Sequence, residues 1–347
     1  MLRSPALPRR LAAVSCALAL ALAGCGGDDD GGGSGSGSDE NPVAQVPSGL
    51  QEQVSAAQDP KESEFPATEG RTLQEVADAI GGGPEMGLAG SVFRAGEDNR
   101  IAFGVIDDTA GFVYGKTALY YAKSPTSPAK GPFPAPADVL VTDPPYRSEQ
   151  AATEADPFAA VYATNVKLPK QPGPYAVMAV TLVDGKPVAA PGQIQTIAPG
   201  DDKIPAVGDA APLVQTDTVA SAGGDVESID TRRPTSDMHE DSFAEVAGKK
   251  PVALLFATPQ LCQSRVCGPV VDIALQLKAK YGDQVDFIHQ EVYAGNDPKK
   301  GLRPPLKAFN LKSEPWLFVV GADGKITTRL EGSFGIKTFE NAIKTAL

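Results

Sequence analysis

Hydrophobic and polar positions follow three different patterns along this chain, and the changes of pattern predict its organisation. Residues 11–22 are almost continuously apolar. Residues 86–198 contain short alternating or β-rich runs, with Pro, Gly and Asp between them. From about residue 205 onward, short apolar runs alternate with longer stretches of helical period. We therefore expect an N-terminal targeting segment, an all-β domain and an α/β domain.

The middle region contains runs of strand length at residues 100–106, 117–122, 160–166, 175–183 and 193–197. Asp184-Gly185 lies between two of them and is a common hairpin turn. No run has a helical period, so the pattern predicts a β-sandwich domain over residues 85–198. This region is similar, in a generic way, to the immunoglobulin-like modules of bacterial surface proteins. It contains neither Cys nor His, so we expect it to recognise partners or to act as a spacer.

A short helix is predicted before this domain, within residues 71–84. Thr72 and Glu75 have the spacing of a capping box, and glycines 81–83 should end the helix. Residues 25–70 are polar and rich in Gly, Ser and Pro. We therefore expect a flexible tether in that segment.

The first 24 residues have the order of an export signal. Arginines precede the apolar run, which is too short for a comfortable membrane span. Leu22-Ala-Gly-Cys25 then resembles the cleavage site of bacterial lipoprotein signals. The resemblance implies removal of residues 1–24 and diacylation of Cys25. The mature protein would then be extracytoplasmic and anchored to the bacterial cell membrane by this lipid, and we expect no transmembrane helix in it.

The α/β region, residues 199–347, begins with a short linker. Its continuous apolar run at 251–258 is typical of a strand that is buried on both faces. The elements predicted after this strand are a helix at 270–282, a strand at 285–293, a helix at 304–310, a hairpin of 316–320 with 326–330, and a helix at 336–346. The order β-α-β-α-β-β-α is that of the thioredoxin fold.

Three segments support this resemblance, which covers residues 205–347. Val207-Gly-Asp-Ala-Ala-Pro212 looks like the entry segment of redoxin-type members. Phe256-Ala-Thr258 matches the strand end before their active-site loop, and the segment from Glu314 to Val320 matches the one that holds their cis-proline. The resemblance to the thioredoxin-like family implies that Pro315 is cis and faces the active-site cysteines.

The candidate chemistry lies in Cys262 and Cys267, the only cysteines beyond the N-terminal region. On a regular helix, residues five apart have a Cα separation of about 8.5 Å, and a disulfide allows only about 7 Å. We therefore expect Cys262 in the loop before the helix and Cys267 near the helix N-terminus. There the helix dipole and Arg265 should favour a thiolate at Cys267, so we expect Cys267 to attack.

These residues depart from the family pattern in two ways. Thioredoxins carry Cys-x-x-Cys, whereas this chain has Cys-x-x-x-x-Cys, and Val270 stands where their second Cys would be. Leu255 occupies the position of their buried Asp, so that proton-transfer group is missing. We still expect a membrane-anchored thiol-disulfide oxidoreductase that acts on the thiols or disulfides of exported proteins and needs no cofactor. The net charge of -12 argues against nucleic acid as a partner.

Other functions fit the same residues. Thr258-Pro259 followed by Cys262 and Cys267 looks like the atypical two-Cys peroxiredoxins, which would make Cys262 the peroxidatic residue. Sco-type proteins bind copper through a Cys pair and a distal His, and His239 and His289 are the only histidines available as metal ligands. A non-catalytic binding lipoprotein with a structural disulfide is the remaining alternative.

Overall fold

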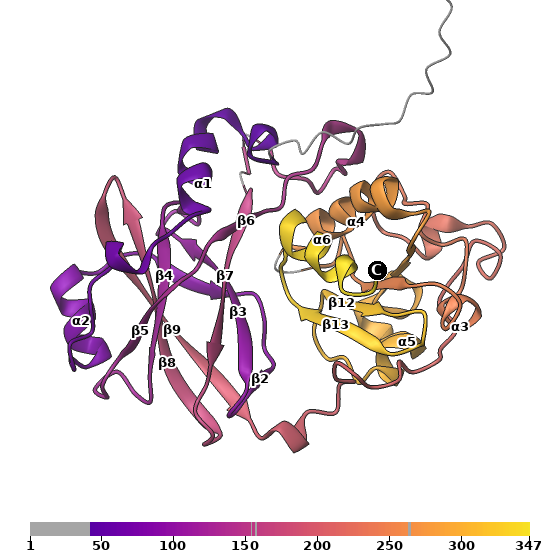
Figure 1. Ribbon diagram of the computed structural model, residues 1–347. Helices are drawn as coiled ribbons and strands as arrows, with labels where there is room; N and C mark the ends of the chain where they lie inside the picture. The colour runs from indigo at the N-terminus through magenta and orange to yellow at the C-terminus, as the bar shows by residue number, and fades with distance from the viewer. Residues whose placement is uncertain (1–41, 154, 157, 263–264) are drawn as a thin grey trace, which may run out of the picture. The chain divides into compact units, whose positions relative to one another are not determined.

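The computed structural model describes residues 42–153, 155–156, 158–262 and 265–347 (Figure 1). The expected signal peptide, Cys25 and the first part of the tether lie outside the described residues. Within the described part, no helix is both long enough and apolar enough to cross a membrane. The described residues belong to a single compact unit, so the boundary expected between residues 198 and 199 stays a prediction.

Residues 42–57 are helical, which differs from the expected flexible tether. They form 3-10 turns at Pro42–Gln45 and Ser48–Leu50, followed by α1 at Gln51–Ala57. Val43, Val46 and Val54 are buried in the core of the β region. These few apolar side chains hold the segment in place although its composition is mostly polar, because burial of an apolar side chain favours the folded state.

The predicted capping-box helix is confirmed as α2 at Leu73–Ile80. The backbone N–H of Glu75 donates to Thr72 Oγ1 at 3.2 Å, and the backbone N–H of Thr72 donates to the Glu75 carboxylate at 2.8 Å. Gly81 follows with φ of 96°, a conformation that favours glycine and ends the helix.

Residues 85–197 form two β-sheets, and each of the predicted strand runs lies in a strand. The first sheet has the order β1-β3-β7-β6, and the second has the order β2-β9-β8-β4-β5. Their strands are β1 Glu85–Leu88, β2 Phe93–Arg94, β3 Asp98–Ile106, β4 Thr117–Ala122, β5 Lys130–Pro134, β6 Ala137–Val139, β7 Ala160–Lys167, β8 Gly173–Val183 and β9 Lys186–Ile197. Side chains of both sheets share one hydrophobic core. An immunoglobulin-like topology stays a prediction.

The hairpin predicted at Asp184-Gly185 is confirmed between β8 and β9. Asp184 has φ of 50° and Gly185 has φ of 73°. Two consecutive positive φ values give a turn whose twist matches that of the paired strands, and Asp-Gly is a favoured sequence for it. This turn sets the register of the longest strand pair in the protein.

The C-terminal region has a four-stranded sheet of order β11-β10-β12-β13. β11 is parallel to its neighbour β10, and the other pairs are antiparallel. Its elements are α3 Phe243–Val246, β10 Val252–Phe256, α4 Cys267–Tyr281, β11 Asp286–Gln290, α5 Pro304–Ala308, β12 Trp316–Val320, β13 Ile326–Glu331 and α6 Ile336–Lys344. From β10 onward this is the predicted β-α-β-α-β-β-α order, so the thioredoxin-like arrangement of this region is confirmed.

Alternate residues of the central strands face opposite sides of this sheet. Leu255 and Leu317 pack with residues of α4 and α6. Leu254 and Phe318 pack with residues of α3 and α5 on the other face. The continuous apolar run of β10 thus reflects burial on both faces, as predicted. The loop between β10 and α4, which leaves the carboxyl end of β10, carries Cys262, and α4 begins with Cys267.

Short 3-10 turns connect the main elements, at Glu62–Glu64, Pro144–Tyr146, Pro199–Asp201, Val226–Ser228, Ala294–Asn296 and Pro298–Lys300.

Candidate active site

The structure confirms the placement of the two cysteines that the spacing argument predicts. Cys262 lies in the loop after β10, and Cys267 is the first residue of α4. Both are thiols in this structure. The two sulfur atoms and a carboxylate oxygen of Glu314 all lie within 4.8 Å of one another. The two sulfur atoms are therefore close neighbours.

The two thiols differ sharply in exposure. Cys262 is partly exposed, whereas Cys267 is completely buried. Burial raises the pKa of Cys267 well above its usual value, and the hydrogen bond with the Cys262 thiol raises it further. This raised pKa runs against the expected thiolate at Cys267, because a thiol without access to solvent is held in its protonated form and cannot meet a partner protein directly. Which of the two residues attacks stays a prediction.

Arg265 does not have the expected role beside Cys267. Its guanidinium pairs with the carboxylate of Asp156 at 2.6 Å, and both side chains are more than half exposed. A solvated cation with its own counter-ion has little effect on a buried sulfur atom. The sequence places Arg265 correctly near the helix start, but it cannot show that a distant aspartate binds the arginine.

The Glu314–Pro315 peptide bond is cis, as the resemblance implies. Pro315 is buried immediately before β12, and the preceding Glu314 brings its carboxyl group to the two sulfur atoms. Burial raises the pKa of Glu314 to about 8, and the negative charges of Cys262 and Glu291 act in the same direction. One carboxyl oxygen accepts a 3.4 Å hydrogen bond from Tyr293, and the other is buried without a hydrogen-bond partner among the described residues.

The carboxyl group of Glu314 is a possible proton acceptor beside the thiols, whereas Leu255, at the position where the resemblance implies a buried aspartate, has none. Leu255 is fully buried among apolar side chains, so it offers no proton acceptor. Glu314, on the cis-proline segment, is instead the titratable group beside the thiols. With its raised pKa it can accept and return a proton near neutral pH. A sequence signal for this role is the acidic residue directly before the expected cis-proline.

Replacement of Glu314 should change the pH dependence of stability. Its pKa rises from the ordinary 4.5 to about 8 on folding, so between these values the unfolded chain releases a proton that the folded protein keeps. The folded state therefore loses stability as the pH rises through this window. The free energy of unfolding, measured with urea, should be higher for Glu314→Gln than for the unmodified protein by about 1–3 kcal/mol above pH 8. Near pH 4 the two free energies should be equal.

The control for this measurement is Glu245→Gln, because Glu245 is an exposed glutamate of α3. This control should show no pH-dependent difference. An equal effect of Glu314→Gln at both pH values would mean that the carboxyl group is not forced into its neutral form by the fold.

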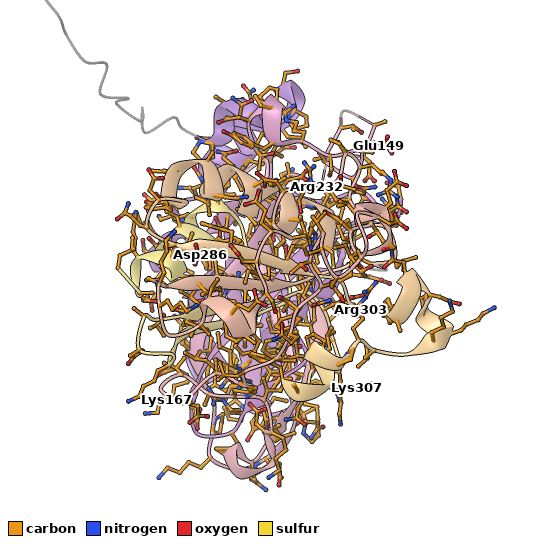
Figure 2. The ribbon with its side chains drawn as sticks, turned by 90° about the vertical axis from the view of Figure 1, so that its right-hand side faces the viewer. Glu149, Lys167, Arg232, Asp286, Arg303 and Lys307 are labelled. Atoms are coloured by element: carbon orange, nitrogen blue, oxygen red, sulfur yellow. The ribbon has the colours of Figure 1, made fainter. Side chains whose placement is uncertain are left out.

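A cavity of about 520 Å³ opens over Cys262. Residues of the loop after β10 line one side, and residues 149–153 of the β region line another. Cys267 and Glu314 are not among the described lining residues. Cys262 therefore borders the cavity and Cys267 does not. The segment 149–153 is held at its first residue, because the backbone N–H of Glu149 donates to the carbonyl of Arg233 at 2.8 Å. Figure 2 labels Glu149 and Arg232, the residue before Arg233.

The region 149–153 packs tightly on the start of α4. A Cβ atom added to Gly268 would lie 2.5 Å from Cβ of Gln150, so glycine is required for this close approach. Residues of the β region thus help to form the entrance to the thiols. The composition of that region, with neither Cys nor His, gave no sign of this contribution.

Thr258, which belongs to the run that resembles peroxiredoxins, lies next to the buried cysteine. A hydrogen bond from its backbone to Cys267 lowers the pKa of that thiol, against the larger effect of burial. Its hydroxyl group is buried without a hydrogen-bond partner among the described residues. This geometry does not test peroxidase activity, which stays a hypothesis.

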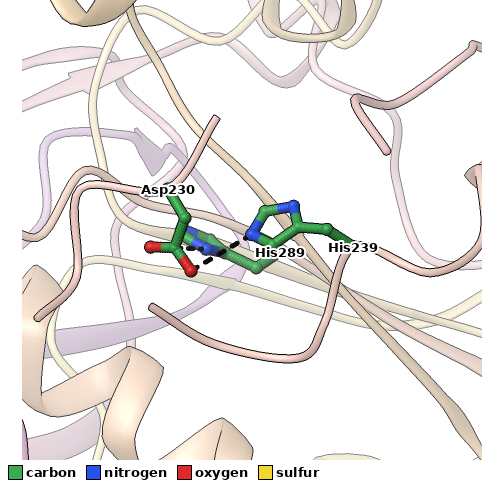
Figure 3. A group of neighbouring side chains, drawn as sticks. All are labelled: Asp230, His239 and His289. Carbon is green, nitrogen blue, oxygen red and sulfur yellow. Dashed lines mark hydrogen bonds and ion pairs between the residues drawn. The ribbon is translucent and has the colours of Figure 1, made fainter. Parts of the chain in front are cut away.

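The two histidines lie together with Asp230 and not with the cysteines (Figure 3). Within the described residues, the donor atoms that approach within 4.8 Å form one group of Cys262, Cys267 and Glu314 and another of Asp230, His239 and His289. The expected copper set of a Cys pair with a distal His is therefore not assembled. Both histidines are fully buried.

Comparisons with known proteins give structural similarities to part of the chain. No protein-family model matches the sequence, and a search of curated proteins gives no match. A putative thiol:disulfide interchange protein DsbE from Chlorobium tepidum is similar in structure, with 16% identity and a TM-score of 0.31 over 41% of this chain and 98% of that one.

Two further solved structures are similar. A thiol:disulfide interchange protein of the thioredoxin family from Chlorobium tepidum TLS has 17% identity and a TM-score of 0.29, over 42% of this chain and 98% of that one. A thioredoxin-like protein in its oxidised form has 18% identity and a TM-score of 0.27, over 31% of this chain and 84% of that one. At such low identities and TM-scores the likeness supports no statement about function.

Proposed function

We propose that this protein is a thiol-disulfide oxidoreductase in which Cys262 attacks and Cys267 resolves. The observation that carries the proposal is the asymmetry of the pair, with a partly exposed thiol in a cavity and a buried thiol within reach behind it. An accessible sulfur can meet the sulfur of another protein, whereas a buried one can be reached only by its neighbour.

In the reducing direction, the Cys262 thiolate attacks one sulfur of a partner disulfide. The partner's S–S bond breaks, the attacked sulfur forms a mixed disulfide with Cys262, and the partner's other sulfur leaves as a thiolate. Cys267 then gives its proton to the carboxylate form of Glu314 and attacks Cys262 Sγ. The mixed disulfide breaks, the Cys262–Cys267 disulfide forms, and the second partner thiolate leaves. The same steps run backwards transfer a disulfide to the partner.

The raised pKa of Glu314 supports its part in this exchange. A carboxyl group with a pKa of about 8 changes protonation state close to neutral pH. It can therefore take the proton of Cys267 when that thiol attacks and return it when the disulfide is reduced again. This places the proton carrier on the cis-proline segment, behind the thiols.

The reduction potential of the Cys262–Cys267 pair tests the proposal. It can be measured by equilibration with glutathione buffers of known ratio, followed by alkylation and mass spectrometry. A working pair should have a potential in the range of exchange proteins, well above the value of about −300 mV below which disulfides behave as inert bridges. A potential below that value would identify a structural disulfide and would overturn the proposal.

The proposal includes the cellular setting that the N-terminal pattern predicts. Cys25 would carry the lipid anchor, and the partners would be thiols or disulfides of exported proteins. Residues 149–153, which line the cavity over Cys262, would take part in the choice of partner.

A further inference from the structure

A second group of polar side chains is buried away from the proposed chemistry. Asp230 precedes a loop that returns at His239, and His289 lies on β11 (Figure 3). All three side chains are completely inaccessible to solvent. His239 Nε2 is 3.2 Å from Asp230 Oδ2, and His289 Nδ1 is 3.7 Å from Asp230 Oδ1.

The contacts of the His289 ring make this arrangement unusual. Its Nε2 lies 3.0 Å from the carbonyl oxygen of Ala257. Because a carbonyl oxygen only accepts, Nε2 must donate to Ala257, and Nδ1 is the ring nitrogen that faces Asp230. Nδ1 faces a carboxylate oxygen across a gap that is too long for a hydrogen bond, and it has no hydrogen-bond partner among the described residues.

The carboxylate of Asp230 is held in its charged form by the loop around it. The backbone N–H groups of Arg232 and Ser236 donate to its two oxygens at 2.8 and 2.6 Å. His289 Nδ1 and a carboxylate oxygen therefore face each other in a fully buried site, at a separation longer than a hydrogen bond, and a bound cation would bridge them.

We propose that Asp230, His239 and His289 bind a divalent first-row transition ion such as Zn²⁺, at a site separate from the cysteines. Two imidazole nitrogens and a carboxylate oxygen form a ligand set that suits such ions. Ligands about 2.05 Å from a tetrahedral ion lie about 3.3 Å apart. His239 Nε2 is 3.2 Å from Oδ2 of Asp230 and His289 Nδ1 is 3.7 Å from Oδ1, and one donor atom of each residue lies within 4.8 Å of the other two. The three side chains are therefore close to the spacing that such an ion needs.

The surroundings of His289 support ligation through Nδ1. Metal-binding histidines usually donate their other ring N–H to a carboxylate or a backbone carbonyl, which fixes the ring. The bond from Nε2 to Ala257 is of this kind.

The test uses the full chain with Cys262→Ser and Cys267→Ser, so that the thiol group cannot bind the added metal. The protein is dialysed with Zn²⁺, or refolded in its presence because the site is buried, and the retained metal is then counted. One equivalent should be retained. His289→Gln and His239→Gln in the same background should weaken binding by about 10- to 100-fold or more.

The control is Asp237→Asn, which removes an exposed carboxylate from the same loop and should leave zinc affinity unchanged. Co²⁺ should give the d–d absorption of nitrogen and oxygen ligands, and this absorption should be lost in His289→Gln. Circular dichroism confirms that each variant folds. Absence of retained zinc after both dialysis and refolding would show a buried imidazolium–carboxylate pair instead and would overturn the proposal, as would unchanged binding by His289→Gln.

Discussion

Cys262→Ser should abolish disulfide exchange, whereas Cys267→Ser should stop the reaction at a mixed disulfide between Cys262 and its partner. The first variant loses the only thiol of the pair that is accessible in the cavity, and the buried Cys267 cannot replace it. The second variant keeps the attacking thiol but lacks the group that breaks the intermediate. We expect the turnover of a fluorescent disulfide substrate to fall by at least about 10³-fold in both variants.

The difference between the two variants appears in their products, which are separated by non-reducing gel electrophoresis and mass spectrometry. Reaction of Cys267→Ser with a disulfide-containing protein should give one covalent adduct at Cys262. The same reaction with Cys262→Ser should give none. Stable adducts at Cys267 in the Cys262→Ser variant would reverse the roles of the two residues and would support the order first expected from the sequence.

The roles proposed for Cys262 and Cys267 are the opposite of those expected from the sequence, and the difference shows what the sequence alone cannot predict. The spacing of Cys262 and Cys267 was enough to place one residue in the loop and the other at the helix start. Which sulfur is exposed to solvent depends on what packs against the first turn of α4. Gln150, from the β region, packs on Gly268 in that turn. Such packing between distant segments leaves no local pattern.

The secondary structure was predictable wherever one face or both faces of an element are apolar. The capping box of α2 and the Asp-Gly turn gave element ends because their chemistry is local. The helix α1 was missed, since its buried Val54 and Ala57 lie within a polar stretch. Asp230 was missed for another reason, because its partner His289 lies far away on β11 and nothing in the sequence links them.

Arg232→Met should destabilise the protein by about 3–5 kcal/mol, because it leaves a buried carboxylate without its counter-ion. Arg232 Nε lies 2.8 Å from Oδ1 of Asp272, and the two side chains are only 3% and 1% exposed. The other carboxylate oxygen accepts from the backbone N–H and the hydroxyl of Ser148, each at 2.9 Å. Arg232 also donates to the carbonyl of Tyr146 at 2.8 Å.

The loss should depend on pH in a direction that identifies its cause. Burial already raises the pKa of Asp272 above its ordinary 3.8, and removal of Arg232 should raise it further. In the variant, the folded state then keeps a proton that the unfolded chain releases as the pH rises above that value. The free energy of unfolding, measured with urea, should therefore differ most from that of the unmodified protein near pH 8, and the difference should become smaller toward pH 4.

Two variants separate this effect from ordinary loss of an arginine. Arg265→Met makes the same substitution in the exposed pair with Asp156, and it should change stability by less than about 1 kcal/mol. Arg232→Met with Asp272→Leu removes both buried charges and should recover part of the loss. Equal effects of Arg232→Met and Arg265→Met would contradict the prediction.

The same bonds connect this ion pair to the entrance of the site. Tyr146 and Ser148 precede the segment 149–153 that lines the cavity over Cys262, and Arg232 and Asp272 hold both of them. Even in conditions where Arg232→Met remains folded, this segment should be less firmly held over α4. Alkylation of Cys267 should then become faster than in the Arg265→Met control, because the buried thiol is protected partly by the β region.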